Sequence, residues 1–544
     1  MKKIATIAVV LLMLVILVAC GSGGDGGSTQ PSQGSSGGSG STPSTPQSSS
    51  GGQTAPAGEK RGPEGQEYGG VMKIATGASL QDPFGVPWMY QSFNRPFVPF
   101  AEALILETYW GDYFPFLAKS WSIDLDKPEI VFVLDEGIQF SDGSPFDAEA
   151  VAWNIEKWME GSIADSAIKG AEVRGKYEVA VLLHDWSNSL ISIFASRISV
   201  MVSKESYEKM GEEASAQNAV GTGPFTLTNR VPGATVTFSR RDGYWREGEP
   251  YLDGIEYYAM SDVMTQNAAV LSTGDDSVDW LQTSRGEQIE FLRDNADVYI
   301  EFLPGGATGL NVSSRNEGSP FAKKEVRQAL SYAIDREAIV AARGFGVWTE
   351  AGQLIPEGYQ GHLPDSYNLT YDPAKAKELL AQAGYPNGLN TDFYCTTSDR
   401  DAAVAIQSML DDVGIRTNLE FPEAGAISTL RYDGFEGITT QGFGVYPNIL
   451  QLWWYYFDAA YMYYPTVWRP QAMMDLYVEA RKDPEVETKK AEDLHKMVLD
   501  DMVAIPIYNT YTAHILKNNM HGTGHPNWGL GTQWLAHSAW KSSN

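Results

Sequence analysis

Apolar positions alternate in some stretches of the chain and recur at helical spacing in others. Alternation predicts strands over residues 69–77 (GGVMKIATG), 129–137 (EIVFVLDEG), 391–397 and 416–421. Helical spacing predicts helices over residues 149–161, 323–344, 372–388 and 483–502. Asp147 is placed to cap the first helix, and an Asp-Pro pair opens the last two. Because strands and helices interleave in this way, we expect an α/β fold.

The N-terminus has the pattern of an export signal. Lys2 and Lys3 precede an apolar run over residues 4–19, which is shorter than the roughly 20 residues of a membrane-spanning helix. Residues 17–20 (LVAC) resemble a bacterial lipobox, which implies cleavage before Cys20 and lipid on its thiol and amino group. We therefore expect residues 1–20 to be a lipoprotein signal peptide. The mature chain is then extracytoplasmic, either anchored to the cell membrane or periplasmic.

Residues 21–67 have a different composition from the rest of the chain. This stretch contains no aromatic residue and, proline apart, no aliphatic side chain larger than alanine. It cannot bury enough apolar surface to offset the entropy lost on ordering. We expect a disordered tether rich in glycine, serine and proline.

Charge and cysteine content narrow the choice of partners and of stabilising forces. The formal net charge is −28, so nucleic acid is not an expected partner. Of the two cysteines, Cys20 belongs to the lipobox, which leaves Cys395 without a disulfide partner. Cys395 lies in a strand-like run, where a small buried hydrophobe is the expected role.

Four stretches in sequence order resemble one family, the family 5 solute-binding proteins of bacterial ABC importers. They are residues 134–153 (LDEGIQFSDGSPFDAEAVAW), 221–257 with GTGPFTL and RRDGYWREGEPYLDGIEY, 320–340 (PFAKKEVRQALSYAIDREAIV) and 371–388 (YDPAKAKELLAQAGYPNG). Members of this family bind oligopeptides, nickel complexes or oligosaccharides. The resemblance implies a two-lobed, periplasmic-binding-protein-like fold of type II, with an extra subdomain on the first lobe.

The resemblance also implies how the lobes divide the chain. Lobe I would comprise residues 68–110, 221–312 and 506–544, its subdomain residues 111–220, and lobe II residues 313–505. Ligands would bind in the cleft between the lobes, which close around them. The implied protein is a monomeric receptor that delivers its solute to the transmembrane subunits of an ABC permease and is held at the membrane by the lipid on Cys20.

Residues 451–465 (QLWWYYFDAAYMYYP) contain an unusual density of aromatic side chains. Trp453, Phe457, Tyr461 and Tyr464 share one helical face, which we expect to be core. The remaining rings point elsewhere, and the run lacks the cationic residues of a membrane-contacting helix. A cleft wall is the better explanation for them. Trp453 is therefore expected in the core and Trp454 against the ligand.

The residues just before this run bear on the type of ligand. Peptide-binding members of the family carry a Trp-x-x-Asp-Tyr-x-x-Pro-like pattern, in which the Asp pairs with the α-ammonium group of the peptide. Aligning Tyr446 with that tyrosine places Val445 at the Asp position and Gly442 at the Trp position. The missing carboxylate favours an uncharged sugar, whereas the family favours a peptide. Both an oligosaccharide and an oligopeptide remain open.

The expected ligand contacts are rings and amides from two segments that follow strand-like runs. They are Trp88, Tyr90, Phe93 and Asn94 in the first segment, and Gln441, Phe443, Tyr446, Asn448 and Trp454 in the second.

The sequence shows no known catalytic motif. Gly-x-Ser-x-Gly, His-Glu-x-x-His and phosphate-loop patterns do not occur, so we expect no enzymatic activity, cofactor or metal. His521 and His525 flank a glycine-containing loop that suits a metal poorly, although nickel-binding relatives keep a nickel complex as a minor alternative. A secreted cleft enzyme such as a glycosidase is the main alternative function. A surface adhesin would need a broad exposed apolar patch.

Overall fold

The computed structural model describes residues 65–77, 80–89, 96–160, 167–196, 199–446, 449–457, 464–483, 488–524 and 534–543. The chain divides into two units, Met1–Ser49 and Ser50–Asn544, and the first unit lies outside the described residues. The expected signal peptide, including Cys20, and nearly all of the expected tether therefore lie outside the described residues.

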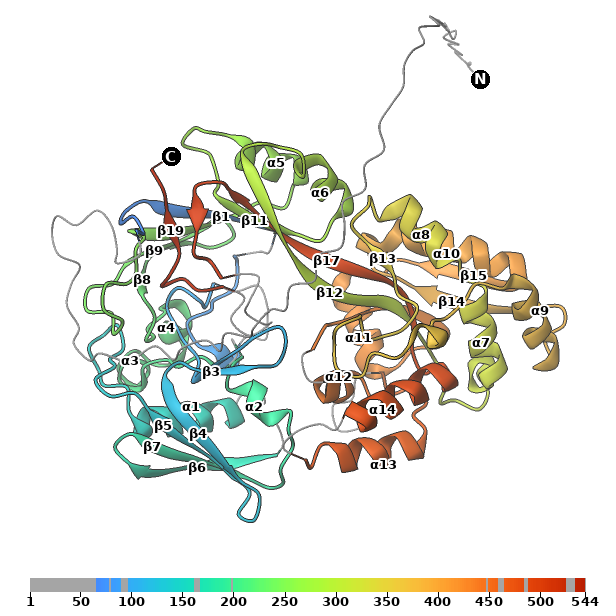
Figure 1. The fold of residues 1–544 in the computed structure, drawn as a ribbon, viewed down its shortest axis with the longest axis horizontal. Helices are drawn as coiled ribbons and strands as arrows, with labels where there is room; N and C mark the ends of the chain where they lie inside the picture. Colours follow the sequence, from blue (N-terminus) through green and yellow to red (C-terminus); the bar gives the residue numbers. More distant parts are fainter. Residues whose placement is uncertain are drawn as a thin grey trace, which may run out of the picture. The chain divides into compact units, whose positions relative to one another are not determined.

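Eleven strands of the described residues join into one large sheet (Figure 1). In spatial order they are β15 (Ile415–Glu420), β14 (Leu389–Tyr394), β16 (Ile438–Phe443), β12 (Val298–Val312), β17 (Ile505–Lys517), β11 (Trp280–Thr283), β1 (Val71–Thr76), β10 (Gly254–Ala259), β9 (Thr235–Arg240) and β8 (Phe225–Val231), with β13 (Thr349–Glu350) paired to β17. The mixed α/β character expected from the sequence is confirmed.

Strands β12 and β17 connect the two halves of this sheet. They pair with each other over most of their length; β17 also pairs with β11 at one end, and β12 pairs with β16 at the other. Figure 1 shows both strands running diagonally through the middle of the molecule. The β12–β17 register shifts between Pro304 and Gly306. Gly306 has a φ of +85°, and a Cβ there would lie 1.9 Å from the carbonyl oxygen of Phe443, so only glycine fits.

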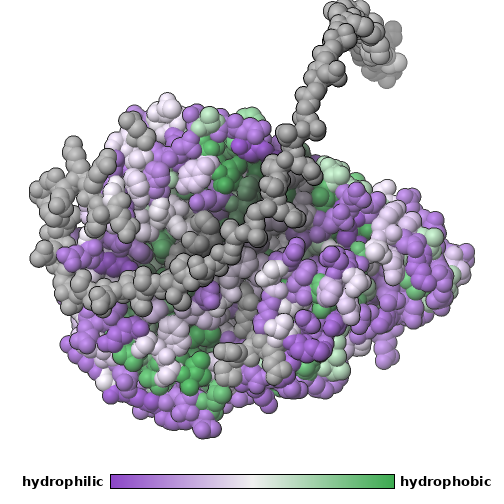
Figure 2. All heavy atoms as spheres, in the orientation of Figure 1, coloured by the Kyte–Doolittle hydropathy of each residue, from purple (hydrophilic) through white to green (hydrophobic). Residues whose placement is uncertain are grey.

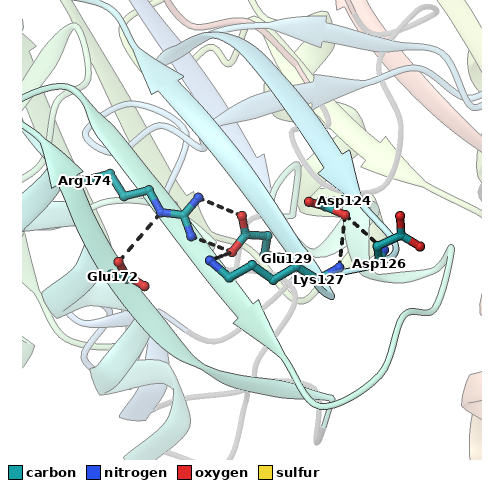
Figure 3. Close-up of polar contacts among 6 residues, drawn as sticks. All are labelled: Asp124, Asp126, Lys127, Glu129, Glu172 and Arg174. Carbon is teal, nitrogen blue, oxygen red and sulfur yellow. Dashed lines mark hydrogen bonds and ion pairs between the residues drawn. The ribbon is translucent and has the colours of Figure 1, made fainter.

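A separate four-stranded antiparallel sheet contains β4 (Ala118–Asp124), β5 (Glu129–Leu134), β7 (Glu178–Leu183) and β6 (Ile168–Gly175). The inner strand β5 and the outer strand β6 are tied across β7 by the carboxylate of Glu129, which accepts hydrogen bonds from two nitrogens of Arg174 at 2.7 and 2.6 Å (Figure 3). Lys127 lies 2.9 Å from the same carboxylate. The Asp124 side chain accepts backbone N–H bonds in the adjoining β4–β5 turn. Two shorter pairs are β2 (Ile105–Glu107) with β3 (Tyr113–Pro115), and β18 (Met520–His521) with β19 (Trp540–Lys541).

Fourteen α-helices of the described residues surround the sheets. They are α1 (Ala148–Glu160), α2 (Leu190–Ile193), α3 (Lys204–Met210), α4 (Glu212–Gln217), α5 (Val263–Leu271), α6 (Gly286–Leu292), α7 (Lys324–Tyr332), α8 (Arg336–Arg343), α9 (Pro373–Gln382), α10 (Arg400–Val413), α11 (Ala424–Asp433), α12 (Ile449–Tyr456), α13 (Gln471–Ala480) and α14 (Thr488–Asp501). None of the helices in the described part of the chain is long and apolar enough to cross a membrane.

Most of the expected local structure is present, with two corrections. The helix expected over residues 372–388 is shorter, because α9 ends at Gln382. Asp147 accepts hydrogen bonds from the first N–H groups of α1, and Asp372 caps α9. The single helix expected over residues 323–344 is wrong, because that segment forms α7 and α8. Asp335 has an extended backbone and its side chain accepts the N–H of Ala338, which starts a new helix there.

The buried apolar side chains form distinct clusters. One large cluster contains residues of β1, β5 and α1, while two others lie between residues 307 and 508 and include α7, α9 and α10 or α12, α13 and α14. Hydrophilic side chains cover most of the coloured surface in Figure 2. Cys395 is fully buried as expected, and burial raises the pKa of its thiol to about 12, which makes the thiol unreactive. The expected lobe boundaries remain a prediction.

Candidate aromatic binding site

Helix α12 divides its aromatic side chains between the core and the surface. Trp453 is fully buried and packs against Phe457 with ring centroids 5.2 Å apart. Tyr464 is also buried in the same cluster, but the expectation that it belongs to the same helix is wrong, because α12 ends at Tyr456. The next three residues after Trp453, which are Trp454, Tyr455 and Tyr456, are only partly buried.

These three rings continue a row that starts on the preceding segment. Tyr446 stacks on Tyr455 with centroids 5.2 Å apart and planes at 28°. Trp454 meets Tyr455 edge-on at 4.7 Å. Tyr456 packs edge-on against Phe443 at 5.2 Å, and its hydroxyl donates to the carbonyl of Gly442 at 3.0 Å. Each pair has a preferred aromatic geometry, so the rings hold one another in place.

A small hollow lies between Tyr446 and the loop formed by residues 354–363. The lining residues are Leu354, Ile355, Pro356, Tyr359, Gln360, Gly444, Val445, Tyr446, Ile449 and Leu452. We call Tyr359, Tyr446, Trp454, Tyr455 and Tyr456 the aromatic wall. All five side chains are uncharged, and two of them, Tyr359 and Tyr446, line the hollow, as aromatic side chains do in sites for small organic solutes.

The loop that carries Tyr359 is fixed by a buried histidine of α14. Nδ1 of His495 donates to the carbonyl of Gly361 at 2.8 Å, and its Nε2 accepts the N–H of Leu354 at 3.1 Å. Burial lowers the pKa of His495 to about 4, so the ring is neutral at pH 7. Burial, followed by the proximity of Tyr511, raises the pKa of Tyr359 to about 12. Its phenol therefore stays protonated and can donate a hydrogen bond to a ligand.

A tryptophan from a distant segment completes one end of the wall. Trp110 stacks on Tyr359 with centroids 5.2 Å apart and planes at 28°. The side chain of Trp110 is 62% exposed, although that of Tyr359 is only 7% exposed. Nearby, Glu107 accepts hydrogen bonds from Tyr113 and Ser192, both at 2.8 Å. Burial raises the pKa of the Glu107 carboxyl despite these bonds.

The structure brings together the second group of expected ligand contacts. Tyr446 and Trp454 both touch Tyr455, and Phe443 packs behind Tyr456 with 1% of its surface exposed. Gln441 lies on the same strand as Phe443. Its amide nitrogen donates to the carbonyl of Gly442, and its Oε1 is buried without a hydrogen-bond partner among the described residues. Asn448 lies outside the described residues.

The first group of expected contacts is only partly described. Trp88 is 7% exposed and packs in the first core cluster, edge-on against Trp153 and Tyr207 at 5.6 and 5.8 Å. Tyr90, Phe93 and Asn94 lie outside the described residues, as does His525. Within the described residues, no group of three His, Cys, Asp or Glu side chains is placed to hold a metal ion.

Sequence reasoning did not identify Trp110 or Tyr359. Both are aromatic residues beside glycine in short turns, in the stretches TYWGDY and PEGYQG. A large aromatic side chain in such a polar turn is the sequence feature that could have marked both residues as candidate ligand contacts. What the turn could not reveal is that the two rings meet.

The signature residues of the 221–257 stretch act in the scaffold. A Cβ at Gly221 or Gly223 would lie 2.2 or 2.5 Å from backbone atoms of Phe100, so glycine permits the two chain segments to touch. Tyr244 and Trp245 donate to the buried carboxyl group of Glu102 at 2.5 and 2.9 Å. These contacts hold chain segments of the scaffold together, and the residues that make them do not belong to the aromatic wall.

The chain matches the model of the bacterial extracellular solute-binding proteins, family 5, over residues 112–472. It is 30% identical over 327 residues to the glutathione-binding protein GsiB of Salmonella paratyphi A, a match that covers 57% of this chain and 61% of that protein. The match therefore spans less than two thirds of the length of the relative.

Solved structures share the fold. The periplasmic binding protein AgaA from Agrobacterium tumefaciens R10, solved with agropinic acid, superposes with a TM-score of 0.74 at 24% identity, over 87% of this chain and 99% of that one. The ABC transporter-associated periplasmic binding protein DppA from Helicobacter pylori was solved with the peptide STSA. It superposes with a TM-score of 0.73 at 20% sequence identity, over 87% of this chain and 98% of that one. The fold expected from the sequence is thereby confirmed, and the chain belongs to the family 5 bacterial extracellular solute-binding proteins.

Proposed function

We propose that this chain is the substrate-binding receptor of an ABC importer, which captures an oligopeptide or oligosaccharide between its lobes and delivers it to a membrane permease. The observation that carries the proposal is the aromatic wall, which gathers uncharged rings from separate chain segments in a member of a solute-binding family. Flat rings bind the C–H faces of sugars and the apolar side chains of peptides. Tyr446, Trp454 and Gln441 are the proposed contacts retained from the sequence, together with Tyr359 and Tyr455.

Two observations favour different ligands within this proposal. Val445, at the position where peptide-binding members carry an aspartate, is 5% exposed and packs in the core, so it offers no charge to a peptide ammonium. This favours a neutral oligosaccharide. The glutathione-binding relative and the peptide-bound DppA structure favour a short peptide. The first experiment must therefore contain both classes.

A thermal-shift screen with glutathione, di- to pentapeptides, and cello-, xylo-, manno- and malto-oligosaccharides tests the proposal. A solute that binds only the folded state stabilises it by RT ln(1 + [L]/Kd), about 2.7 kcal/mol at a hundredfold excess over Kd. Trp454→Ala and Tyr455→Ala should reduce the shift by half or more. Phe291→Ala, which removes a 58% exposed ring on α6, is the matched control and should retain it. Turnover of any solute would instead identify an enzyme.

We also propose that lipid on Cys20 holds the receptor at the membrane. The support is the LVAC lipobox after the apolar run of residues 4–19. Cys20→Ala should move the protein from the detergent phase to the aqueous phase or leave its signal uncleaved. Unchanged partitioning of a correctly processed chain would disprove the anchor while leaving the receptor proposal intact.

A further inference from the structure

Asn188 makes an unusual set of hydrogen bonds to the end of a helix far away in the sequence. Its backbone N–H donates to the carbonyl of Arg481 at 3.0 Å. Its side-chain Nδ2 donates to the carbonyls of Asp483 at 3.1 Å and Ala480 at 3.5 Å. Helix α13 ends at Ala480, and the last carbonyls of a helix lack partners within the helix. Asn188 therefore supplies a C-terminal cap to α13 from another part of the chain.

Both partners of this contact are firmly held by their own surroundings. Asn188 is 2% exposed and lies between Trp186 and Leu190, which are buried in the first core cluster. Helix α13 buries Met473 and Tyr477 in the third cluster. The hydrogen bonds therefore join two separate hydrophobic cores. In Figure 1, α2, which follows Asn188, lies in the lower half of the molecule, to the left of α13.

The stack of Trp110 on Tyr359 joins the same two parts of the chain at a second point. Trp110 lies between β2 and β3, and β2 begins in the first core cluster at Ile105. Tyr359 lies in the third cluster and lines the hollow beside Tyr446. Because Trp110 is 62% exposed, it adds little to either core, although its ring stacks on that of Tyr359.

We propose that Asn188 and Trp110 form a clasp that holds the part of the chain with the first core cluster against the third cluster, whose residues line the hollow, before any solute binds. The inference rests on the proposed function only in taking the hollow as the binding site. Both contacts are of a reversible kind. When the contact opens, water can replace the hydrogen bonds of Asn188 to the helix-end carbonyls, and an exposed stack gives up little buried surface when it separates. The clasp therefore biases the receptor toward a closed state without locking it.

A pre-closed state affects affinity directly. The apparent Kd equals the intrinsic Kd divided by the fraction of molecules that are competent to bind. Loss of the two side-chain bonds of Asn188 should shift the equilibrium between closed and open forms by roughly tenfold, which corresponds to 1.4 kcal/mol. Asn188 thus acts as a positioning residue for the site, although it does not line the hollow.

The test is small-angle X-ray scattering of the full-length chain without solute, combined with thermal unfolding. Asn188→Ala should increase the radius of gyration. Asn188→Asp should increase it further, because it places a carboxylate against carbonyl oxygens. Ser187→Ala is the matched control, since Ser187 hydrogen-bonds Ser189 at 2.9 Å within its own loop. Trp110→Ala should open the chain as well, and Trp110→Phe should restore the wild-type value by keeping a ring on Tyr359.

The unfolding midpoint separates the clasp from a general structural role. The Trp110 variants should unfold close to the wild-type temperature, because that side chain is exposed, and Asn188→Ala should lower the midpoint by no more than the loss of its two side-chain hydrogen bonds. An unchanged radius of gyration in both Asn188→Ala and Trp110→Ala would overturn the proposal, as would an increase in Ser187→Ala of equal size. These measurements use no solute, so their failure would leave the receptor proposal standing. Failure of the solute screen would likewise leave the clasp standing.

Discussion

Trp453 and Trp454 are adjacent on helix α12 but have opposite environments: the first is fully buried against Phe457, and the second is partly exposed against Tyr455. Neighbouring helical residues point about 100° apart, so one indole enters the core while the other reaches the aromatic wall. The same two side chains therefore allow stability and binding to be tested separately.

Trp453→Ala should lower the free energy of unfolding by about 3–5 kcal/mol, because it empties a large volume in a packed core. Trp454→Ala should unfold nearly as the wild type does yet bind the identified solute at least tenfold more weakly. Urea denaturation and titration calorimetry measure the two effects. If both variants fold and bind like the wild type, α12 does not form part of the site.

His495 should make stability fall in mild acid. Its pKa is lowered to about 4 by burial, whereas the ordinary value is 6.5. The neutral ring therefore contributes stability that is complete above pH 6.5 and is lost as the pH falls from 6.5 to 4. A shift of this size corresponds to about 3 kcal/mol.

His495→Gln should remove this pH dependence, because an amide can donate to Gly361 and accept from Leu354 without titrating. Amide hydrogen exchange at Leu354 gives a local reading of the same event, with faster exchange in wild-type protein near pH 4. His184→Gln, at an exposed position, is the control. Equal pH profiles for wild type and His495→Gln would contradict the prediction.

The stabilising contribution of Glu129 should be lost in a lower pH range than that of His495. Hydrogen bonds from Arg174 are the main cause that lowers the pKa of this carboxyl from 4.5 to about 2. Its contribution is complete above pH 4.5 and is lost between pH 4.5 and 2. Because Lys127 is exposed and Arg174 is partly exposed, solvent screening reduces the contribution to about 1 kcal/mol.

Glu129→Gln should therefore be less stable than wild type by about 1 kcal/mol at pH 7, with the difference disappearing near pH 2. Glu172→Gln provides the control, since Glu172 lies 3.8 Å from Arg174 and is more exposed. A difference that persists at pH 2 would show that packing, rather than charge, accounts for the role of Glu129.

Arg336 is a buried cation that is held by backbone oxygens. Its Nε donates to the carbonyl of Pro506 at 2.9 Å, and one terminal nitrogen donates to the hydroxyl of Ser331 at 3.1 Å. Arg336→Lys should destabilise the protein by about 3 kcal/mol, because an ammonium group cannot reproduce the fork and remains buried with fewer partners.

The control for Arg336 lies on the same helix. Arg343 is a partly exposed partner of Asp401 at 2.6 Å, and Arg343→Lys should change the free energy of unfolding by less than about 0.5 kcal/mol. If a denaturant titration shows a similar decrease in the free energy of unfolding for the two variants, burial does not explain the difference between the two arginines.

Short-range sequence patterns determined most of the local structure. The strands β1, β5, β14 and β15 lie where alternation predicts them, and Asp147 and Asp372 cap the expected helices. These features depend on side chains within a few residues of one another. The prediction of a single helix over residues 323–344 is wrong. The apolar spacing continues through Asp335, but the helical backbone is interrupted there. Capping by Asp335 outweighs the periodicity there.

The sequence by itself also determined the family and the division of α12 between Trp453 in the core and a more exposed Trp454, because signature motifs and helical faces are local properties. Only the tertiary structure decided that Trp110 meets Tyr359 and that Asn188 caps α13 from 292 residues before Ala480. These contacts depend on how β12 and β17 set the two halves of the large sheet side by side. No periodicity within one segment encodes the distance between two segments so far apart.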